Sequence, residues 1–382
     1  MEFLKRTEEE LQLLDAVDRF IEKRIKPLRE AYNDVPLPKP VAHQVLAELA
    51  EFGYIAGTAP ESVGGYGLSN VMQGLLTERL SRAFPGLAGT AFIHSAMTNR
   101  IAMAGSKKQQ DTYLQKMLNA EMIGCGAITE PSVGSNTADV ATRATRTQDG
   151  WSISGEKVWI SNGNISDIAS VVARTGEGKN GLSRFLVERK DGYTSSDIPK
   201  MAMNEWSTAT LNFNAKVPDW RQVGDEGKGL QITLVGFQTA RAYVAMLSVG
   251  IAQACLDLAI AYAQEREQWG KRIAQHQMIQ EMIADMATLT DNARLLALRG
   301  LYLVDQGVRC DVQTSMAKGY ATEAAIEVAS KAVQIHGACG ISSEFPVERY
   351  FREARILTIP DGTTQIQKLI IGRGLTGLRA FN

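Results

Sequence analysis

The sequence WSISGEKVWISNG occupies residues 151–163. It is rich in β-branched and aromatic residues and is bounded by the turn pairs Asp149-Gly150 and Asn162-Gly163, a pattern typical of short β-strands. Similar runs, IASVVAR at 168–174 and SRFLVER at 183–189, follow between further turn residues. Together these runs predict a small antiparallel β domain.

On both sides of this region, apolar residues recur every three or four positions, which indicates helices. Leu14 and Val17 show this spacing near the start of the chain, and Val249, Leu256 and Ala263 show it after the β region. We therefore predict a mostly α-helical chain with a central β domain. Its expected parts are an N-terminal helical domain (1–120), the middle β domain (121–225) and a C-terminal helical bundle domain (226–382).

Composition narrows the possible functions. The 382 residues carry a net charge of -1 and are 45% hydrophobic, so neither a nucleic acid nor an anionic membrane is expected as the main partner. The apolar stretch from Val244 to Ile260 contains Gln253 and Asp257, which favours a buried helix over a membrane span.

The spacing of cysteine and histidine residues bears on metal binding and on the cellular compartment. The four cysteines form no CxxC pair and the four histidines no HExxH pattern, so no metal site is expected and a reducing compartment fits best. The acidic, amphipathic N-terminal stretch is unlike a signal or transit peptide. We therefore expect a cytoplasmic protein.

Two segments of the β region have a functional and a structural interpretation. The loop AITEPSVGSN at 127–136 could bring backbone N–H groups close to a polar ligand, or it could be an ordinary turn. Trp159 lies beside the Ser161 hydroxyl in KVWISNG. Its ring could cover a planar cofactor, or it could be a core tryptophan.

Three C-terminal segments are similarly open. QEREQWGK at 264–271 could bind phosphate or simply end a helix. In QIHGACG at 334–340, His336 could be an acid or base, but it has no titratable partner nearby in sequence, which favours a structural role. In IPDGTTQIQ at 359–367, Asp361 precedes a helix expected to begin near Thr363. Its carboxylate could be a base on a rigid loop or a helix cap.

The order of these segments resembles that of the acyl-CoA dehydrogenase family over essentially the whole chain. AITEPSVGSN is similar to the family's TEPxxGS loop, KVWISNG to its KxWITNG strand and EREQWGKRI to its RxxFGxxI/L segment. AVQIHGACG is similar to the family's QxxGGxG turn. FPVERYFREARI and PDGTTQIQ are similar to its PVxRxxRDAKI stretch and EGTSxIQ loop.

This resemblance implies the same three-part fold with a C-terminal four-helix bundle, and FAD bound between the β domain and that bundle. It implies a homotetramer, built as a dimer of dimers, in which a second subunit touches each FAD. Ile128 and Thr129 would lie at the cofactor, with Thr129 on the pyrimidine side of the flavin. Trp159 would lie against the flavin and Ser161 at its N5 atom.

The resemblance also assigns the remaining site residues. Thr363 and Gln365 would contact FAD from the catalytic loop, while Ser135 and Arg241 would serve the acyl-CoA. Four residues are expected at the FAD of a neighbouring subunit: Arg266, Trp269, Gln277 and Gln334. Gly337 is expected as one further cofactor-binding residue.

The implied reaction is α,β-dehydrogenation of an acyl-CoA thioester. Asp361 would take the α-proton while flavin N5 accepts the β-hydride, and an electron-transfer flavoprotein would receive the electrons. The backbone N–H of Asp361 or Gly362 would stabilise the developing enolate oxygen.

Two departures from the family pattern bear on substrate and mechanism. The base is usually Glu, so the Asp361 carboxylate lies about 1.5 Å further back. The alternative base position on the helix after Phe237 corresponds to Ala240, and no Asp or Glu occurs between Glu78 and Asp111. Pro360 replaces a Tyr common in straight-chain enzymes, which indicates a branched, cyclic or otherwise bulky acyl group.

Other interpretations remain open from the sequence. One is a relative with different chemistry, such as a nitroalkane oxidase, which uses Asp at this loop position, or an enzyme for thioesters of a carrier protein. Another is a non-catalytic FAD-binding member, against which the carboxylate at position 361 argues.

Overall fold

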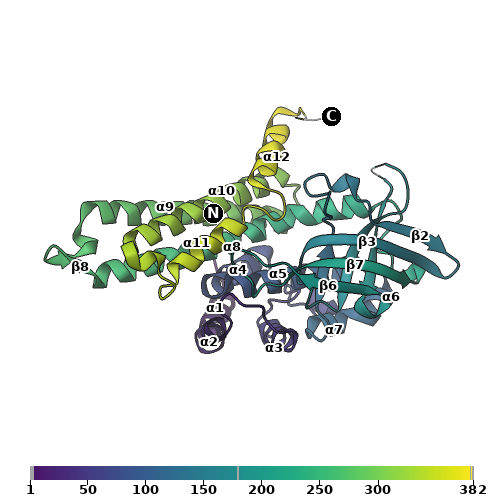
Figure 1. Ribbon diagram of the computed structural model, residues 1–382, viewed down its shortest axis with the longest axis horizontal. Helices are drawn as coiled ribbons and strands as arrows, with labels where there is room; N and C mark the ends of the chain where they lie inside the picture. The colour runs from purple at the N-terminus through teal and green to yellow at the C-terminus, as the bar shows by residue number, and fades with distance from the viewer. Residues whose placement is uncertain (1–3, 179, 379, 381–382) are drawn as a thin grey trace.

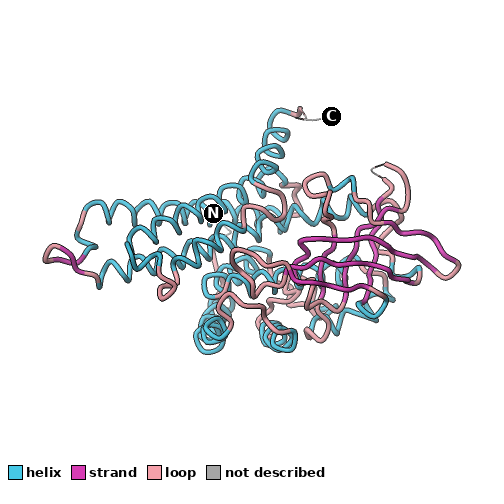
Figure 2. The backbone as a smooth tube through the Cα atoms, viewed as in Figure 1, coloured by secondary structure: helices cyan, strands magenta, loops and turns pink. Residues whose placement is uncertain are grey.

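The computed structural model describes residues 4–178, 180–378 and 380. Helices form both ends of the chain and a sheet forms its middle, as the sequence predicts. The sheet lies at one end of the molecule, long C-terminal helices extend away from it, and shorter N-terminal helices lie beneath (Figure 1). Figure 2 shows the strands of the large sheet gathered at one end of the molecule and a short hairpin at the far end of the long helices.

The N-terminal helices begin at residues that cap them well. The Thr7 hydroxyl accepts a hydrogen bond from the Glu10 amide (3.2 Å) and the Ser69 hydroxyl one from the Met72 amide (3.0 Å), each satisfying an amide that a helix start leaves free. The helices are α1 (Glu8–Phe20), α2 (Lys26–Ala31), α3 (Lys39–Ala50), α4 (Asn70–Ala83), α5 (Pro85–Ala104), α6 (Lys107–Gln109) and α7 (Gln115–Leu118).

The central sheet differs from the prediction in the direction of one strand. Its order is β1-β4-β2-β3-β7-β6, with β5 also paired to β4. Most pairings are antiparallel, as predicted, but β1 runs parallel to β4, and β2 meets β4 in parallel at Arg143. The strands are β1 (Gly124–Ala127), β2 (Arg143–Thr147), β3 (Gly150–Ser161), β4 (Ile168–Arg174), β5 (Leu182–Glu188), β6 (Tyr193–Asp197) and β7 (Thr208–Val217).

Most of the stretch WSISGEKVWISNG forms one strand, β3, which ends at Ser161. The glycine within it, Gly155, makes no turn. A Cβ atom there would lie 2.6 Å from the Thr142 hydroxyl, so the glycine allows close packing within a continuous strand.

The C-terminal helices form the predicted bundle. Helices α8, α9 and α10 pack against one another, α11 lies against α8 and α10, and α12 packs on α10. A short hairpin, β8–β9, caps the end far from the sheet (Figure 1). The elements are α8 (Gly229–Glu265), β8 (Glu267–Gln268), β9 (Lys271–Arg272), α9 (Gln277–Asp305), α10 (Asp311–His336), α11 (Val347–Ile356) and α12 (Thr364–Thr376).

One apolar core joins the N-terminal helices to the bundle, and the sheet encloses a second core around Trp151, Phe185 and Phe213. Among the described residues, α8 is the one helix long and apolar enough to cross a membrane, but 72% of its most apolar window is buried inside the protein. The prediction of a buried helix for Val244 to Ile260 is therefore confirmed.

Candidate active site

Asp361 lies on the loop between α11 and α12, and the residue after it fixes the shape of that loop. Asp361 has φ +53° and Gly362 φ +95°, a left-handed conformation that glycine adopts readily. A Cβ atom at Gly362 would lie 2.7 Å from the Gln367 Nε2 atom. The loop therefore requires glycine at position 362 for both conformation and space.

Two buried side chains hold this loop in place by donating hydrogen bonds to its backbone. Lys318 on α10 donates from Nζ to the carbonyl oxygens of Thr358 (2.9 Å) and Gly362 (2.8 Å). Gln367 on α12 donates from Nε2 to those of Asp361 (3.2 Å) and Gly362 (2.8 Å). Both side chains are fully buried. The sequence analysis did not identify either residue.

Burial and nearby cations act in opposite directions on the Asp361 carboxyl. Burial raises its pKa, while the positive charges of Lys318 and Arg241 lower it. Burial in turn lowers the pKa of Lys318 to about 8. A carboxyl whose basicity is increased by burial, and whose ionised form is favoured by neighbouring cations, can accept a proton from a bound ligand.

The backbone of the same loop offers hydrogen-bond donors. Within the described chain, neither the Asp361 nor the Gly362 amide donates to a backbone acceptor, although both carbonyl oxygens accept bonds from Gln367. Amides left free beside a carboxylate can stabilise negative charge that develops on a carbonyl oxygen.

Arg241 and the residues at the start of α12 complete this side of the site. Arg241 is buried, its nearest carboxylate is Asp311 at 3.6 Å, and its Nε atom has no partner among the described residues. The Thr363 hydroxyl accepts a hydrogen bond from the Ile366 amide (3.4 Å). Thr363 therefore caps α12, the helix expected to begin near it, and the Asp361 carboxylate does not. Gln365 is exposed.

The β domain supplies a second wall. Lys157 donates from Nζ to the Ile128 carbonyl (2.9 Å) and the Glu130 carboxylate (2.8 Å), and the Val158 amide donates to the Thr129 carbonyl (2.9 Å). The loop carrying Ile128 and Thr129 is thereby tied to the strand carrying Trp159. Both members of the Lys157–Glu130 ion pair are buried.

The side chain of Trp159 is turned out of the sheet. Its φ is +61°, it lies within a bulge of β3 between Lys157 and Ile160, and it is 57% exposed. The alternative of a core tryptophan is therefore wrong. A flat, exposed ring next to Thr129 and the half-buried Ser161 fits a planar cofactor such as a flavin, while Ser135 is exposed nearby in sequence.

A third group of predicted site residues lies at the opposite end of the bundle (Figure 1). Trp269, in the β8–β9 hairpin, is 92% exposed. His336 is buried and stacks on Tyr262 with ring centroids 4.3 Å apart, which favours a structural role, and burial lowers its pKa. Within one chain these residues are far from the sheet: Arg266, Trp269, Gln277, Gln334 and Gly337.

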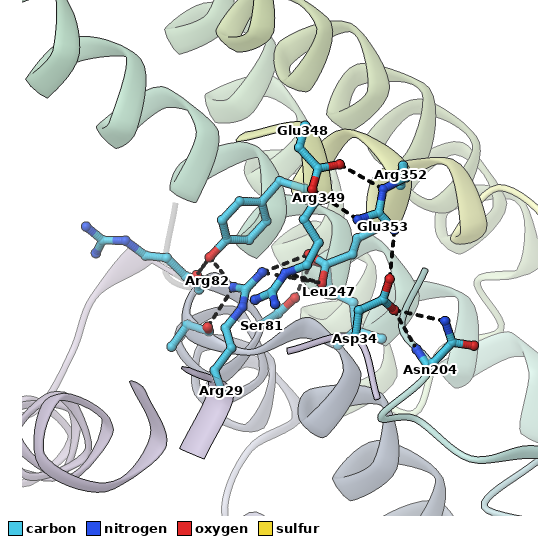
Figure 3. A network of polar contacts seen from close by, with 12 residues as sticks. Arg29, Asp34, Ser81, Arg82, Asn204, Leu247, Glu348, Arg349, Arg352 and Glu353 are labelled. Carbon is cyan, nitrogen blue, oxygen red and sulfur yellow. Dashed lines mark hydrogen bonds and ion pairs between the residues drawn. The ribbon is translucent and has the colours of Figure 1, made fainter. Parts of the chain in front are cut away.

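A polar network positions α11, the helix that leads into the loop carrying Asp361 (Figure 3). Arg29 of α2 pairs with Glu353 (3.1 Å), and Arg352 pairs with Asp34 (2.8 Å) and Glu348 (2.8 Å). A groove of about 800 Å³ lies beside these residues, and no predicted site residue lines it. The network therefore supports the active site from outside it.

Comparison with known proteins identifies the family. Models of the acyl-CoA dehydrogenase N-terminal, middle and C-terminal domains match residues 7–121, 125–215 and 227–376. An acyl-CoA dehydrogenase of Bacillus subtilis is 33% identical over 380 residues, covering 97% of this chain and 99% of the relative. A caffeyl-CoA reductase-Etf complex subunit, CarC, of Acetobacterium woodii is 33% identical over 362 residues, covering 92% and 94%.

Solved structures agree in fold. A glutaryl-CoA dehydrogenase of Mycobacterium smegmatis in complex with FADH2 has a TM-score of 0.91 and 29% identity, covering 99% of this chain and 97% of that one. The chain therefore belongs to the acyl-CoA dehydrogenase family and is an FAD-dependent oxidoreductase that acts on acyl-CoA.

Proposed function

We propose that this protein catalyses α,β-dehydrogenation of an acyl-CoA thioester with Asp361 as the base. The observation that carries the proposal is the loop around Asp361, which hydrogen bonds from Lys318 and Gln367 hold in place. It presents one carboxylate, whose pKa is raised by burial, together with two backbone amides that are free within the described chain. Bound FAD would supply the acceptor for the β-hydrogen, which leaves as a hydride.

The residues of this chain would divide the remaining work. Asp361 would take the α-proton, and the amide of Asp361 or Gly362 would bind the thioester oxygen as its negative charge grows. Trp159, Thr129 and Ser161 would hold the flavin from the β domain. Arg241 would serve the CoA part of the substrate.

We further propose that the acyl group is branched, cyclic or otherwise bulky. Pro360 stands directly before the base and has no aromatic side chain. Its ring also stiffens the loop. The pocket beside the α-carbon is then wider than one that carries Tyr at this position.

The proposed assembly is a homotetramer in which one subunit completes the FAD site of another. Trp269 and Arg266 are exposed and lie in or beside the β8–β9 hairpin, at the end of the bundle away from the sheet (Figure 1), which supports contact with a second copy. An electron-transfer flavoprotein is the proposed acceptor, since the relative CarC is named as part of an Etf complex. All four cysteines are free, which supports a reducing, cytoplasmic setting.

The experiment is an anaerobic titration of the purified flavoprotein with straight, branched, alicyclic and aromatic-substituted acyl-CoAs. Bleaching of the flavin band by the bulky classes is expected. Asp361→Asn should abolish bleaching while FAD stays bound, and Asp149→Asn, at an exposed turn, is the matched control. Unchanged bleaching in Asp361→Asn would refute the assignment of the base.

The same preparation separates the alternatives. Bound flavin that no acyl-CoA bleaches, combined with oxygen consumption on addition of a nitroalkane, would identify nitroalkane oxidation instead. Bleaching only by an acyl carrier protein thioester would identify a carrier-linked substrate. Bound flavin that none of these reduces would identify a non-catalytic member.

A further inference from the structure

A buried arginine without a carboxylate partner lies between the sheet and the bundle. Arg184 of β5 is 2% exposed. Its guanidinium donates to the hydroxyl oxygens of Ser170 on β4 (2.9 Å) and Thr233 on α8 (2.5 Å). Its Nε atom has no partner among the described residues. Neutral hydroxyls accept hydrogen bonds but do not neutralise the charge.

A second arginine shares this location. Arg100 of α5 makes no hydrogen bond or ion pair within the described chain, and its Nη1 atom is buried without a partner. Its Nη2 atom lies 2.8 Å from the place that a Cβ atom would take at Gly236, one turn after Thr233 on α8. Burial and the charge of Arg100 both lower the pKa of Arg184, which places the two cations within electrostatic reach of each other.

The surrounding elements supply no compensating acid. Helix α5, strand β4 and the first three turns of α8 contain no Asp or Glu. The one acid of β5, Glu188, pairs with Arg221 (2.6 Å). Arginine stays protonated in proteins, and a buried charge without a partner costs several kcal/mol. Arg184 is buried and Arg100 is half-buried, so an anion bound between them would supply the negative charge that this part of the fold lacks.

The position of the pair relates it to the active site. Thr233 and Gly236 precede Arg241 on α8 by eight and five residues, or about 12 and 7.5 Å along the helix. Arg241 in turn feels the charge of Asp361. A ligand held at Asp361 by its thioester could therefore place another of its groups at Arg100 and Arg184.

We propose that Arg100 and Arg184 together bind an anionic group of the thioester ligand, a carboxylate or a phosphate, at the junction of α5, β5 and α8. Guanidinium groups match both anions through paired hydrogen bonds. The inference rests on the proposed function, because it takes the ligand to be an acyl thioester. The anion could belong to the acyl group, as a second carboxylate, or to the phosphates of CoA.

The test measures binding rather than turnover. Asp361→Asn holoenzyme is titrated by calorimetry with butyryl-CoA, succinyl-CoA and the pantetheine thioesters of the same two acyl groups. Tighter binding of succinyl than butyryl thioesters would locate the carboxylate of the acyl group at the pair. Tighter binding of CoA than pantetheine thioesters would point to a phosphate instead.

Variants then show whether the arginines carry that preference. Arg184→Met and Arg100→Met should each reduce it by about tenfold or more, and Arg184→Lys should retain part of it. Arg143→Met, an exposed arginine of β2, should change nothing. Because the unpaired charge is removed, ligand-free Arg184→Met should melt no lower than the parent protein.

Two outcomes would overturn the inference. One is an unchanged preference in both methionine variants that retain FAD. The other is a lower melting temperature of the ligand-free variants together with unchanged affinities, which would assign the arginines a structural role. Failure of the proposed function would look different, because it is read from the flavin: the parent protein would bind thioesters without bleaching, or Asp361→Asn would still bleach, whatever the arginine variants bind.

Discussion

Replacement of Lys318 by Met tests whether hydrogen bonds from this lysine hold the Asp361 loop in place. The substitution keeps the length of the side chain but removes both hydrogen bonds that its ammonium donates to the loop. It also removes one of the two cations that lower the pKa of Asp361. We therefore expect a slower reaction and an altered pH dependence from a residue that does not touch the substrate.

The structure limits the size of the effect. After the change the Thr358 carbonyl has lost its Lys318 donor, while the Gly362 carbonyl still accepts the bond from Gln367 (2.8 Å). The loop is thus released at its start and held at its end. A displacement of about 1 Å can cost about 100-fold in rate, so a loss of about 10- to 100-fold in flavin reduction is expected.

The pH dependence has a defined sign. Without the Lys318 charge the pKa of Asp361 is higher, so the carboxylate ionises at higher pH. In the profile of flavin reduction rate against pH, the acidic limb should therefore shift to higher pH. The measurement is anaerobic stopped-flow reduction by the best acyl-CoA across a pH series, with FAD content recorded for each sample.

A matched substitution on the same helix provides the control. Lys331→Met removes an ion pair with Asp285 on the surface of the bundle, where such pairs contribute little, and its rate and profile should equal those of the parent protein. A Lys318→Met variant with full FAD, an unchanged rate and an unmoved acidic limb would refute the argument that this lysine positions and tunes the loop.

Two further changes probe the β-domain wall of the site, and a third probes Glu205, a buried carboxyl near the Arg29–Glu353 pair. Lys157→Met leaves the buried Glu130 carboxylate without its cation, so the free energy of unfolding in urea should fall by about 3–5 kcal/mol, and an equal value would contradict the role of this ion pair. Trp159→Ala should weaken FAD retention but leave the melting temperature of the apoprotein almost unchanged, because the ring is 57% exposed. Burial and the nearby Glu353 raise the pKa of Glu205. The folded protein therefore keeps this proton while the unfolded chain releases it above about pH 4, and stability falls as pH rises. Glu205→Gln cannot ionise and should remove this loss of stability. The free energy of unfolding in urea of the variant, minus that of the parent protein, should therefore be larger at about pH 8 than at about pH 5. An equal difference at the two pH values would contradict the raised pKa of Glu205.

Local sequence patterns were sufficient for much of the fold and part of the site. Strand composition and turn pairs located β4 and β5, and helical spacing located α1 and α8. The start of α12 was predictable because Thr363 is a good capping residue. The exposure of Trp159 was not predictable in this way. It depends on a bulge in β3 and a positive φ, which aromatic residues rarely adopt.

The residues that support the site could not be identified from local patterns, since their partners are distant in the chain. Arg29 and Glu353 are 324 residues apart, and Lys318 is 44 residues from Gly362. One signal for Lys318 was present. Lys318 shares one face of α10 with Thr314, Ala317 and Ala321, which are all buried, and it is the charged residue on that face. A lysine on such a face must have buried acceptors.

The same loop geometry bears on the replacement of Glu by Asp at position 361. Asp is one of the few residues other than glycine that adopt a positive φ with some frequency, and Asp361 has φ +53°. The shorter side chain and the backbone conformation are therefore compatible. Since Lys318 and Gln367 fix the loop through three of its carbonyl oxygens, the loop is not free to move forward on its own. If Asp361 acts as the base, as proposed, the ligand must make up for the missing methylene, and its α-carbon would approach the loop more closely. Pro360, which has no aromatic ring, would leave more room for that approach than Tyr.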